Sequence, residues 1–112
     1  MVKAGALKKR YISFAVKGDS GAAFSEEEFK RGFYSEALKF FGEYGLSFVS
    51  LKVHEYDALS GKGIIRCARD KIDEVRGFLA LINEINGKKA RVVAEKTSGA
   101  VGQLKGDRIK AD

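Results

Sequence analysis

Apolar side chains recur along this chain with two different periods, and the order of these periods predicts its secondary structure. Residues 10–17 and 46–57 alternate apolar and polar side chains, a period of two that is typical of half-buried strands. Between them, residues 25–44 place aromatic and apolar side chains three and four positions apart, which predicts an amphipathic helix. Ser25 and Glu28 have the spacing of a capping box at the start of that helix.

The second half of the chain repeats a similar order. The segment ALSGKG turns the chain back, and residues 63–69 form the second strand of the expected hairpin. Asp70 is expected to cap a second helix, whose apolar positions continue until Gly87 ends it. Residues 91–96 then form a fourth, short strand.

The order strand, helix, strand, strand, helix, strand predicts an α/β fold of the α+β sandwich type. It is a ferredoxin-like or RNA-recognition-motif-like βαββαβ arrangement, with an antiparallel sheet and both helices on one face. A length of 112 residues predicts a single domain over 1–112. Its expected terminal additions are a basic arm at 1–9 and, within 97–112, a short helix and tail. Gly32 and Gly42 both weaken the first helix, and the pattern leaves open which of them breaks it.

Charge is unevenly distributed along the chain. The net charge is +6, and the first 17 residues carry five positive charges and no negative ones, which favours an acidic partner. Cys67 and His54 are the only cysteine and histidine, too few for a disulfide or a metal cage. No apolar run approaches the roughly 20 residues that span a bilayer. We expect a cytoplasmic protein that contacts no membrane and binds no cofactor of its own.

Residues suited to catalysis are scarce. His54 is expected on the sheet face away from the helices, and Cys67 points towards the core, where a thiol is usually inert packing. The acidic run at 26–28 lies in the first helical turn, where the helix dipole explains it. The loop SGKG lacks the residues of a phosphate-binding P-loop. The isolated chain is therefore predicted to be non-catalytic, with no catalytic and no metal-binding residue.

Two arginines at the third strand need an explanation. If Cys67 faces the helices, Arg66 lies on the opposite, open face of the sheet, and Arg69 falls at the strand end. They are either solvated surface charges or part of a face that meets phosphate. RNA recognition motifs begin this strand with a basic residue and a glycine, as Lys62 and the next residue do, but then place aromatic residues where this chain has Ile64 and Arg66. The aromatic residues expected on the open face are Tyr11, Phe48 and Tyr56.

Several segments match a known family in order and spacing. They are KKRYISFAV at 8–16, FFGEYGLS at 40–47, GIIRCARDKIDEVRGFLALINEINGKKARV at 63–92 and TSGAV at 97–101. With these segments the chain resembles archaeal ribonuclease P protein component 2, a family with a eukaryotic counterpart among the precursor-processing subunits. The chain departs from the family at Ala100, where threonine is frequent, and in having no proline before the first strand.

The resemblance implies a role in a ribonucleoprotein endoribonuclease that removes the 5′ leader from precursor tRNA. In that enzyme the RNA subunit and its bound Mg²⁺ perform the hydrolysis, and this chain would bind RNA backbone and neutralise charge. The implied partners are ribonuclease P RNA and the TIM-barrel ribonuclease P protein component 3, with precursor tRNA contacted indirectly. A homodimer within a heterotetramer is left open.

The candidate contact residues follow from charge, position and this resemblance. On the first helix, Tyr34 and Leu38 lie four residues apart on one flank, and they either contact a protein partner or pad the core. A small-anion-binding regulatory module of ferredoxin-like fold is the alternative function. An acylphosphatase-like hydrolase is disfavoured, because the second and third strands lack the asparagine it uses. The candidate RNA-binding residues are Lys8, Lys9, Arg10, Tyr11, Lys62, Arg66, Arg69, Lys88, Lys89, Arg91 and Lys105.

Overall fold

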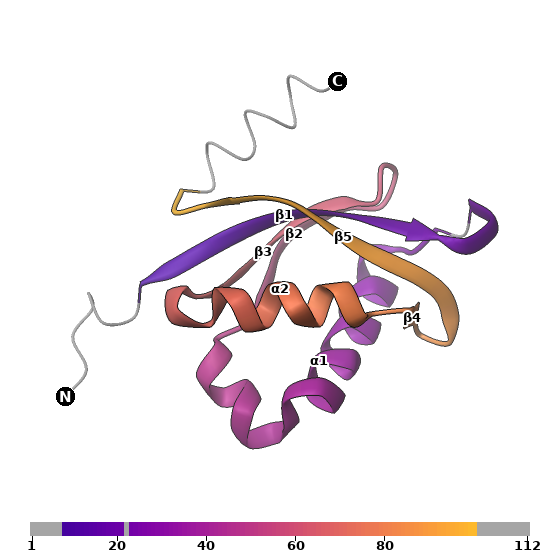
Figure 1. The fold of residues 1–112 in the computed structure, drawn as a ribbon. Coiled ribbons are helices and arrows are strands. Elements are labelled where there is room, and N and C mark those ends of the chain that lie inside the picture. The colour runs from indigo at the N-terminus through magenta and orange to yellow at the C-terminus, as the bar shows by residue number, and fades with distance from the viewer. Residues whose placement is uncertain (1–7, 22, 101–112) are drawn as a thin grey trace.

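A curved antiparallel sheet covered on one face by two helices makes up the computed structural model, which describes residues 8–21 and 23–100 (Figure 1). Its elements are β1 (Lys9–Gly18), the 3-10 turn η2 (Asp19–Gly21), α1 (Glu26–Val49), β2 (Lys52–Asp57), β3 (Lys62–Ala68), the 3-10 turn η3 (Arg69–Lys71), α2 (Ile72–Leu81), β4 (Glu84–Ile85) and β5 (Lys88–Ser98). The five strands are ordered β2-β3-β1-β5-β4. This confirms the predicted ferredoxin-like fold and adds β4, which the sequence pattern did not predict.

The core lies between the sheet and the helices and is rich in stacked aromatic rings. Phe14 of β1 stacks on Phe29 of α1 with ring centroids 5.3 Å apart, and Phe29 stacks on Tyr56 of β2 at 4.5 Å. β1 was expected to be half-buried, but Ser13 and Ala15 on its other side are also buried. β1 is the central strand of the sheet, and β3 and β5 flank it on both edges.

The first helix starts as predicted and ends later than predicted. The Glu28 N–H donates to Ser25 Oγ at 3.1 Å, and the Ser25 N–H donates to Glu28 Oε1 at 3.0 Å, which confirms the capping box. The helix is broken at Gly42, not at Gly32, with φ 75° and ψ 166°. It then resumes and ends at Val49, so the strand expected from residue 46 is wrong over its first part.

Apolar spacing explains this error. Beyond the break, Leu46 and Val49 are three positions apart and both pack on the core, which suits a helical turn. Val49 is also spaced by two from Leu51, as in a strand that alternates. Short apolar runs are ambiguous in this way, and only their contacts decide between the two structures.

We expect Gly42→Ala to destabilise the fold by about 1–3 kcal/mol, because φ and ψ there lie in a region that only glycine occupies readily. An added Cβ would meet nothing within 4 Å, so the effect isolates backbone strain from packing. The control is Gly45→Ala, whose Cβ makes only an ordinary 3.6 Å contact with Phe41. Urea denaturation should show the control unchanged or slightly stabilised, and equal behaviour of the two variants would contradict the assignment.

The second helix is shorter than the periodicity predicts. Its N-cap is Lys71 without a side-chain cap bond, and Asp70 lies in the preceding turn η3, so the expected Asp70 cap is wrong. The helix ends at Leu81 rather than at Gly87.

An Asn-Gly hairpin replaces the expected end of this helix. Asn86 and Gly87 have φ 53° and 80°, and they connect β4 to β5. Positive φ at both central residues is the geometry that makes Asn-Gly a preferred hairpin turn. β5 accordingly starts at Lys88 and ends at Ser98, which makes it longer than the strand expected over 91–96. The short helix expected near 100–105 lies outside the described residues.

Candidate nucleic-acid interface

The sheet face opposite the helices is covered by neither α1 nor α2 and is called the open face below, although its central residues Ser13, Ala15 and Ile64 are buried (Figure 1). Strand register places Tyr11 of β1 beside Arg66 of β3, and Arg66 beside Lys52 of β2. On its other side Tyr11 is paired with Ser98 of β5. The predicted orientation of Arg66 is confirmed, because its neighbours Ile65 and Cys67 both belong to the buried core.

Arg66 and Lys52 form a cross-strand pair of like charge. Like charges directly opposite each other destabilise a sheet, so their presence is unfavourable for the isolated fold. Neither residue is among those that form ion pairs in the described part of the chain. In addition, Nε of Arg66 is buried without a hydrogen-bond partner, a state that typically costs about 1–3 kcal/mol. An anion bound beside the two side chains would relieve the like-charge repulsion.

Tyr11 and His54 supply the aromatic part of this face. Their rings meet edge to face with centroids 5.4 Å apart, and His54 is exposed. Phe48 and Tyr56, which were also expected here, lie elsewhere. Phe48 belongs to α1, and Tyr56 stacks on Phe29 in the core.

A register shift in β2 explains the position of Tyr56. The pairing of β2 with β3 shifts between Val53 and Glu55, as in a β-bulge. A bulge inserts one extra residue and so changes which side chains face the core. As a result Val53 and Tyr56, three positions apart, both pack on the core side.

The start of β1 brings the N-terminal cations next to the end of β3. The Arg69 N–H donates to the Lys8 carbonyl at 2.9 Å, and Lys9 is paired with Ala68. Arg10 is partly buried and donates through Nη1 to the carbonyl of Lys9 at 3.1 Å. Candidate residues that are about sixty positions apart in sequence therefore share one end of the sheet, together with Tyr11 and Arg66.

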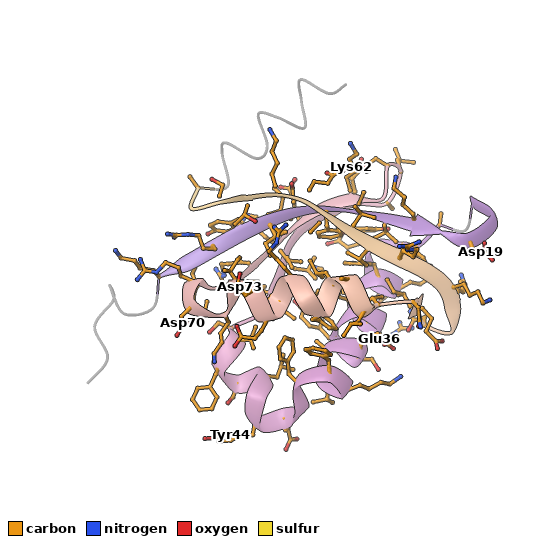
Figure 2. The ribbon with its side chains drawn as sticks, viewed as in Figure 1. Asp19, Glu36, Tyr44, Lys62, Asp70 and Asp73 are labelled. Carbon is orange, nitrogen blue, oxygen red and sulfur yellow. The ribbon has the colours of Figure 1, made fainter. Side chains whose placement is uncertain are left out.

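Other predicted contact residues lie far from this end. Lys88 sits on the β4–β5 hairpin, where its Nζ is 3.6 Å from Glu28 and 5.4 Å from the centroid of the Phe24 ring. Hydrogen bonding to the Ser25 backbone, and then the charge of Lys88, hold the pKa of Glu28 below its usual value. Lys62 projects near the β2–β3 turn (Figure 2). Lys105 lies outside the described residues.

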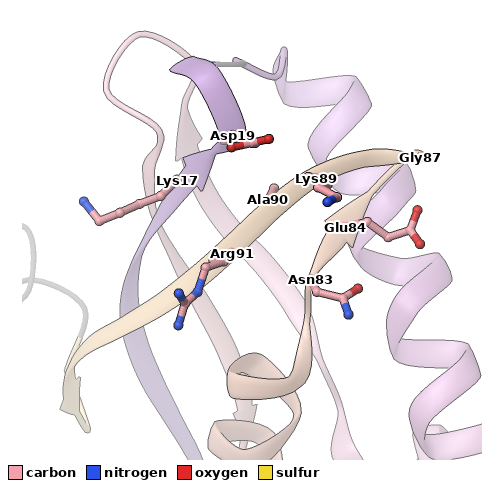
Figure 3. A pocket seen from close by; sticks show the side chains of 9 residues that line it. Lys17, Asp19, Asn83, Glu84, Gly87, Lys89, Ala90 and Arg91 are labelled. Carbon is pink, nitrogen blue, oxygen red and sulfur yellow. The ribbon is translucent and has the colours of Figure 1, made fainter.

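A second cation pair stands at the opposite end of the sheet. Lys17 of β1 is paired with Arg91 of β5, beside a hollow of about 790 Å³. Asp19 and Glu84 also line this hollow, and Figure 3 shows Glu84 directed away from Lys17 and Arg91. Lys89 completes its charged lining, so the hollow has mixed charge.

Sequence reasoning missed Lys17 and Lys52 as members of these pairs. Each stands alone among neutral or apolar neighbours in its own strand, so neither belongs to a visible basic run. The signal appears only when the strands are placed in register, because a cross-strand pair joins residues that are distant in sequence.

Tyr34 and Leu38, the predicted protein-contact pair, differ in their surroundings. Tyr34 is partly buried, and its hydroxyl oxygen accepts the Val53 N–H at 2.7 Å, which ties α1 to β2. Leu38 is 47% exposed. Tyr44 lies at the bottom of the view in Figure 2 and extends away from the sheet. The other large exposed apolar side chains of the two helices are Phe40, Phe48 and Leu81.

Cys67 is a free, buried cysteine. Burial raises the pKa of the Cys67 thiol to about 11, although Lys9 acts in the opposite direction, so the nucleophilic thiolate is scarce at neutral pH. Among residues 8–21 and 23–100, no three or more His, Cys, Asp and Glu side chains are grouped to hold a metal ion. Within the same residues, no helix is long and apolar enough to cross a bilayer.

These features define the class of the protein: a small α+β sandwich of ferredoxin-like type with cation pairs on its open sheet face. The model of the Rpp14/Pop5 family matches residues 10–108, and the chain belongs to this family.

Individual relatives agree with this assignment. Ribonuclease P protein component 2 of Pyrococcus furiosus is 34% identical over 98 residues, which cover 88% of this chain and 80% of the relative. The protein of the same name from Methanosarcina mazei is 32% identical over 94 residues, covering 84% and 78%. These matches confirm the resemblance found in the sequence.

A solved structure shows the same fold. A chain in the cryo-EM structure of yeast ribonuclease MRP superposes with a TM-score of 0.67, covering 95% of this chain and 97% of that one. Its sequence identity is 12%, so the likeness is one of fold.

Proposed function

We propose that this chain is a protein subunit of ribonuclease P that binds RNA backbone through the open face of its sheet. The observation that carries the proposal is the Lys52–Arg66 pair, in which two like charges are adjacent and the buried Nε of Arg66 lacks an acceptor. A phosphate would satisfy the guanidinium with charge-assisted hydrogen bonds and would neutralise the pair. Membership of the Rpp14/Pop5 family supports the choice of RNA.

In this proposal the chain assists cleavage of precursor tRNA and the RNA subunit performs it. No three or more carboxylate, thiol or imidazole groups among the described residues are grouped to hold a metal, so we assign Mg²⁺ to the RNA. The protein would contribute fixed positive charge that reduces phosphate repulsion near the catalytic RNA. Precursor tRNA would be contacted indirectly.

We assign the exposed apolar residues of the two helices to a protein partner, the TIM-barrel ribonuclease P protein component 3. Phe40 and Leu81 line a shallow groove of about 180 Å³ between the helices, and Tyr44 and Phe48 form an exposed aromatic pair. Clusters of this kind are typical of protein contact sites. Pairing of two copies through the same surface is the alternative, and light scattering of the chain alone would detect it.

A small-anion regulatory module is less well supported. Such a site needs donors that converge in one pocket. The hollow beside Lys17 and Arg91 is lined by Asp19 and Glu84 as well, and the Lys52–Arg66 pair lies on the sheet. Cations distributed over a broad face suit an extended polyanion better.

The salt dependence of RNA binding tests the proposed face. Replacing Lys8, Lys9 and Arg10 together with alanine should weaken binding to an archaeal ribonuclease P RNA. It should also reduce the magnitude of the slope of log K against log salt concentration by about 2–3, because counterions are released only where a phosphate contact forms. The backbone bond from Arg69 to Lys8 survives this change.

The matched control for this experiment removes three cations from the helix side. Alanine at Lys30, Arg31 and Lys39 changes the net charge equally on α1, where Lys30 and Lys39 already pair with Glu26 and Glu36. The salt dependence of RNA binding by this control should stay close to that of the unmodified chain. If its slope of log K against log salt concentration falls as much as that of the variant at Lys8, Lys9 and Arg10, the RNA does not bind on the proposed side.

A further inference from the structure

The outer edge of β5 is largely uncovered. β4 pairs only with its first two residues, Ile85 with Lys88 and Glu84 with Lys89. The Ala90 N–H then donates to the Asn83 carbonyl at 3.2 Å, which shows that Ala90 points its backbone groups to this outer edge.

The next backbone groups at this edge meet no strand. Since these groups alternate in direction along a strand, Val92 and Ala94 direct their N–H and C=O to the same edge as Ala90. No strand of the described residues pairs with them there. An edge of this kind is a template for an added strand.

A groove runs beside this edge. It has a volume of about 290 Å³ and separates β5 from α2, which lies alongside β5 in Figure 1. Leu79, Ala80 and Ile82 give it an apolar wall on the side of α2. Arg76 and Arg91 line it as well, and none of its lining residues is acidic. Arg76 Nη1 donates to Thr97 Oγ1 at 2.8 Å, which holds the guanidinium beside β5.

We propose that this edge binds an extended, acidic segment of a protein partner as an additional β strand. The backbone of the segment would pair with Val92 and Ala94, as in other cases of strand addition. Alternate apolar side chains of the segment would enter the groove, and its carboxylates would meet Arg76 and Arg91. The surface is separate from the Lys52–Arg66 pair, so the inference does not rest on RNA binding by the open face.

Charge and backbone chemistry favour this occupant over two others. β5 has the sequence KKARVVAEKTS, with four cations and one carboxylate, so antiparallel pairing of two copies along this edge would bring like charges together. A nucleic acid could neutralise the arginines, but it has no alternating amide groups to pair with the strand edge. An acidic polypeptide satisfies both the backbone and the charges.

A synthetic heptapeptide that alternates glutamate and valine tests the proposal on the full chain. We expect it to bind and to slow hydrogen exchange at the amides of Val92 and Ala94. A second peptide, N-methylated at alternate amides, keeps the charges but loses one edge of donors, and its affinity should be at least about tenfold lower. Single-stranded RNA should not displace the peptide.

Charge reversal in the protein provides the second arm. Arg76→Glu should lower the affinity of the protein for the peptide by at least about tenfold. Arg31→Glu, an equal change of charge at an exposed site on α1, should change this affinity by no more than about twofold. Any one of four results would overturn the proposal. These are no binding up to roughly 1 mM peptide, equal affinity of the methylated peptide, equal effects of the two variants, and displacement of the peptide by RNA, which would make this edge part of an RNA site.

Discussion

Replacing Gly32 with alanine is expected to lower Tm by about 10 °C, which corresponds to roughly 2 kcal/mol for a domain of this size. The cause is close packing of the β4–β5 hairpin on α1. A Cβ at Gly32 would lie 2.9 Å from the backbone N of Asn86 and would also overlap the side chain of Ile85. Ile85 is fully buried, so the hairpin can yield only by leaving the helix. Thermal unfolding followed by circular dichroism measures the change.

Gly77→Ala is the matched control for this prediction. Gly77 also lies inside a helix, but an added Cβ would meet nothing within 4 Å there. Alanine should therefore stabilise the protein by roughly 0.5–1 kcal/mol through its higher helix propensity. If Gly32→Ala is as stable as Gly77→Ala, the hairpin does not pack on α1 as described.

Arg66→Ala is expected to reduce RNA affinity by about tenfold, the effect of losing one good charge-assisted contact. Precursor tRNA cleavage, reconstituted with the RNA subunit, should fall at low Mg²⁺ and recover at high Mg²⁺. The physical reason is that a missing positive side chain leaves phosphate repulsion that the metal ion then has to screen. Thermal stability should be unchanged or slightly higher, because the substitution removes both a buried unsatisfied donor and a repulsive cross-strand pair.

Two further variants separate charge from structure at this position. Arg66→Lys keeps the charge but loses the planar fork, so it should restore part of the affinity. Arg31→Ala removes an exposed arginine from the helix side and should have no effect on cleavage. An Arg66→Ala protein that melts early and stays inactive at every Mg²⁺ concentration would show that Arg66 is structural.

The sequence predicted correctly those features that depend on residues close together in the chain. The capping box at Ser25, the presence of the strand β1 and the order of the main elements depend on residues a few positions apart, and all three are confirmed. The burial of Cys67 is confirmed for the same reason, since it follows from alternation within one strand. The family resemblance is confirmed by relatives that match most of the chain.

The errors arise where a local pattern allows two structures. The apolar positions at Ile82 and Ile85 suit a helix face, yet they are buried by a hairpin that turns at Asn86 and Gly87. The Asn-Gly pair was the available sequence signal for that turn. At residues 46–49 the choice between helix and strand depended on packing beyond the Gly42 break.

The sequence by itself determined the fold class, the helix start at Ser25, the inward direction of Cys67 and the outward direction of Arg66. Tertiary structure alone decided that Gly42 breaks the helix and that the β4–β5 hairpin packs closely against Gly32. It also decided that a register shift in β2 directs Tyr56 towards the core. It also placed Lys52 beside Arg66, which defined the candidate interface. The physical reason is that periodicity records which side of an element is buried, whereas register and close approach depend on contacts between segments that are distant in the chain.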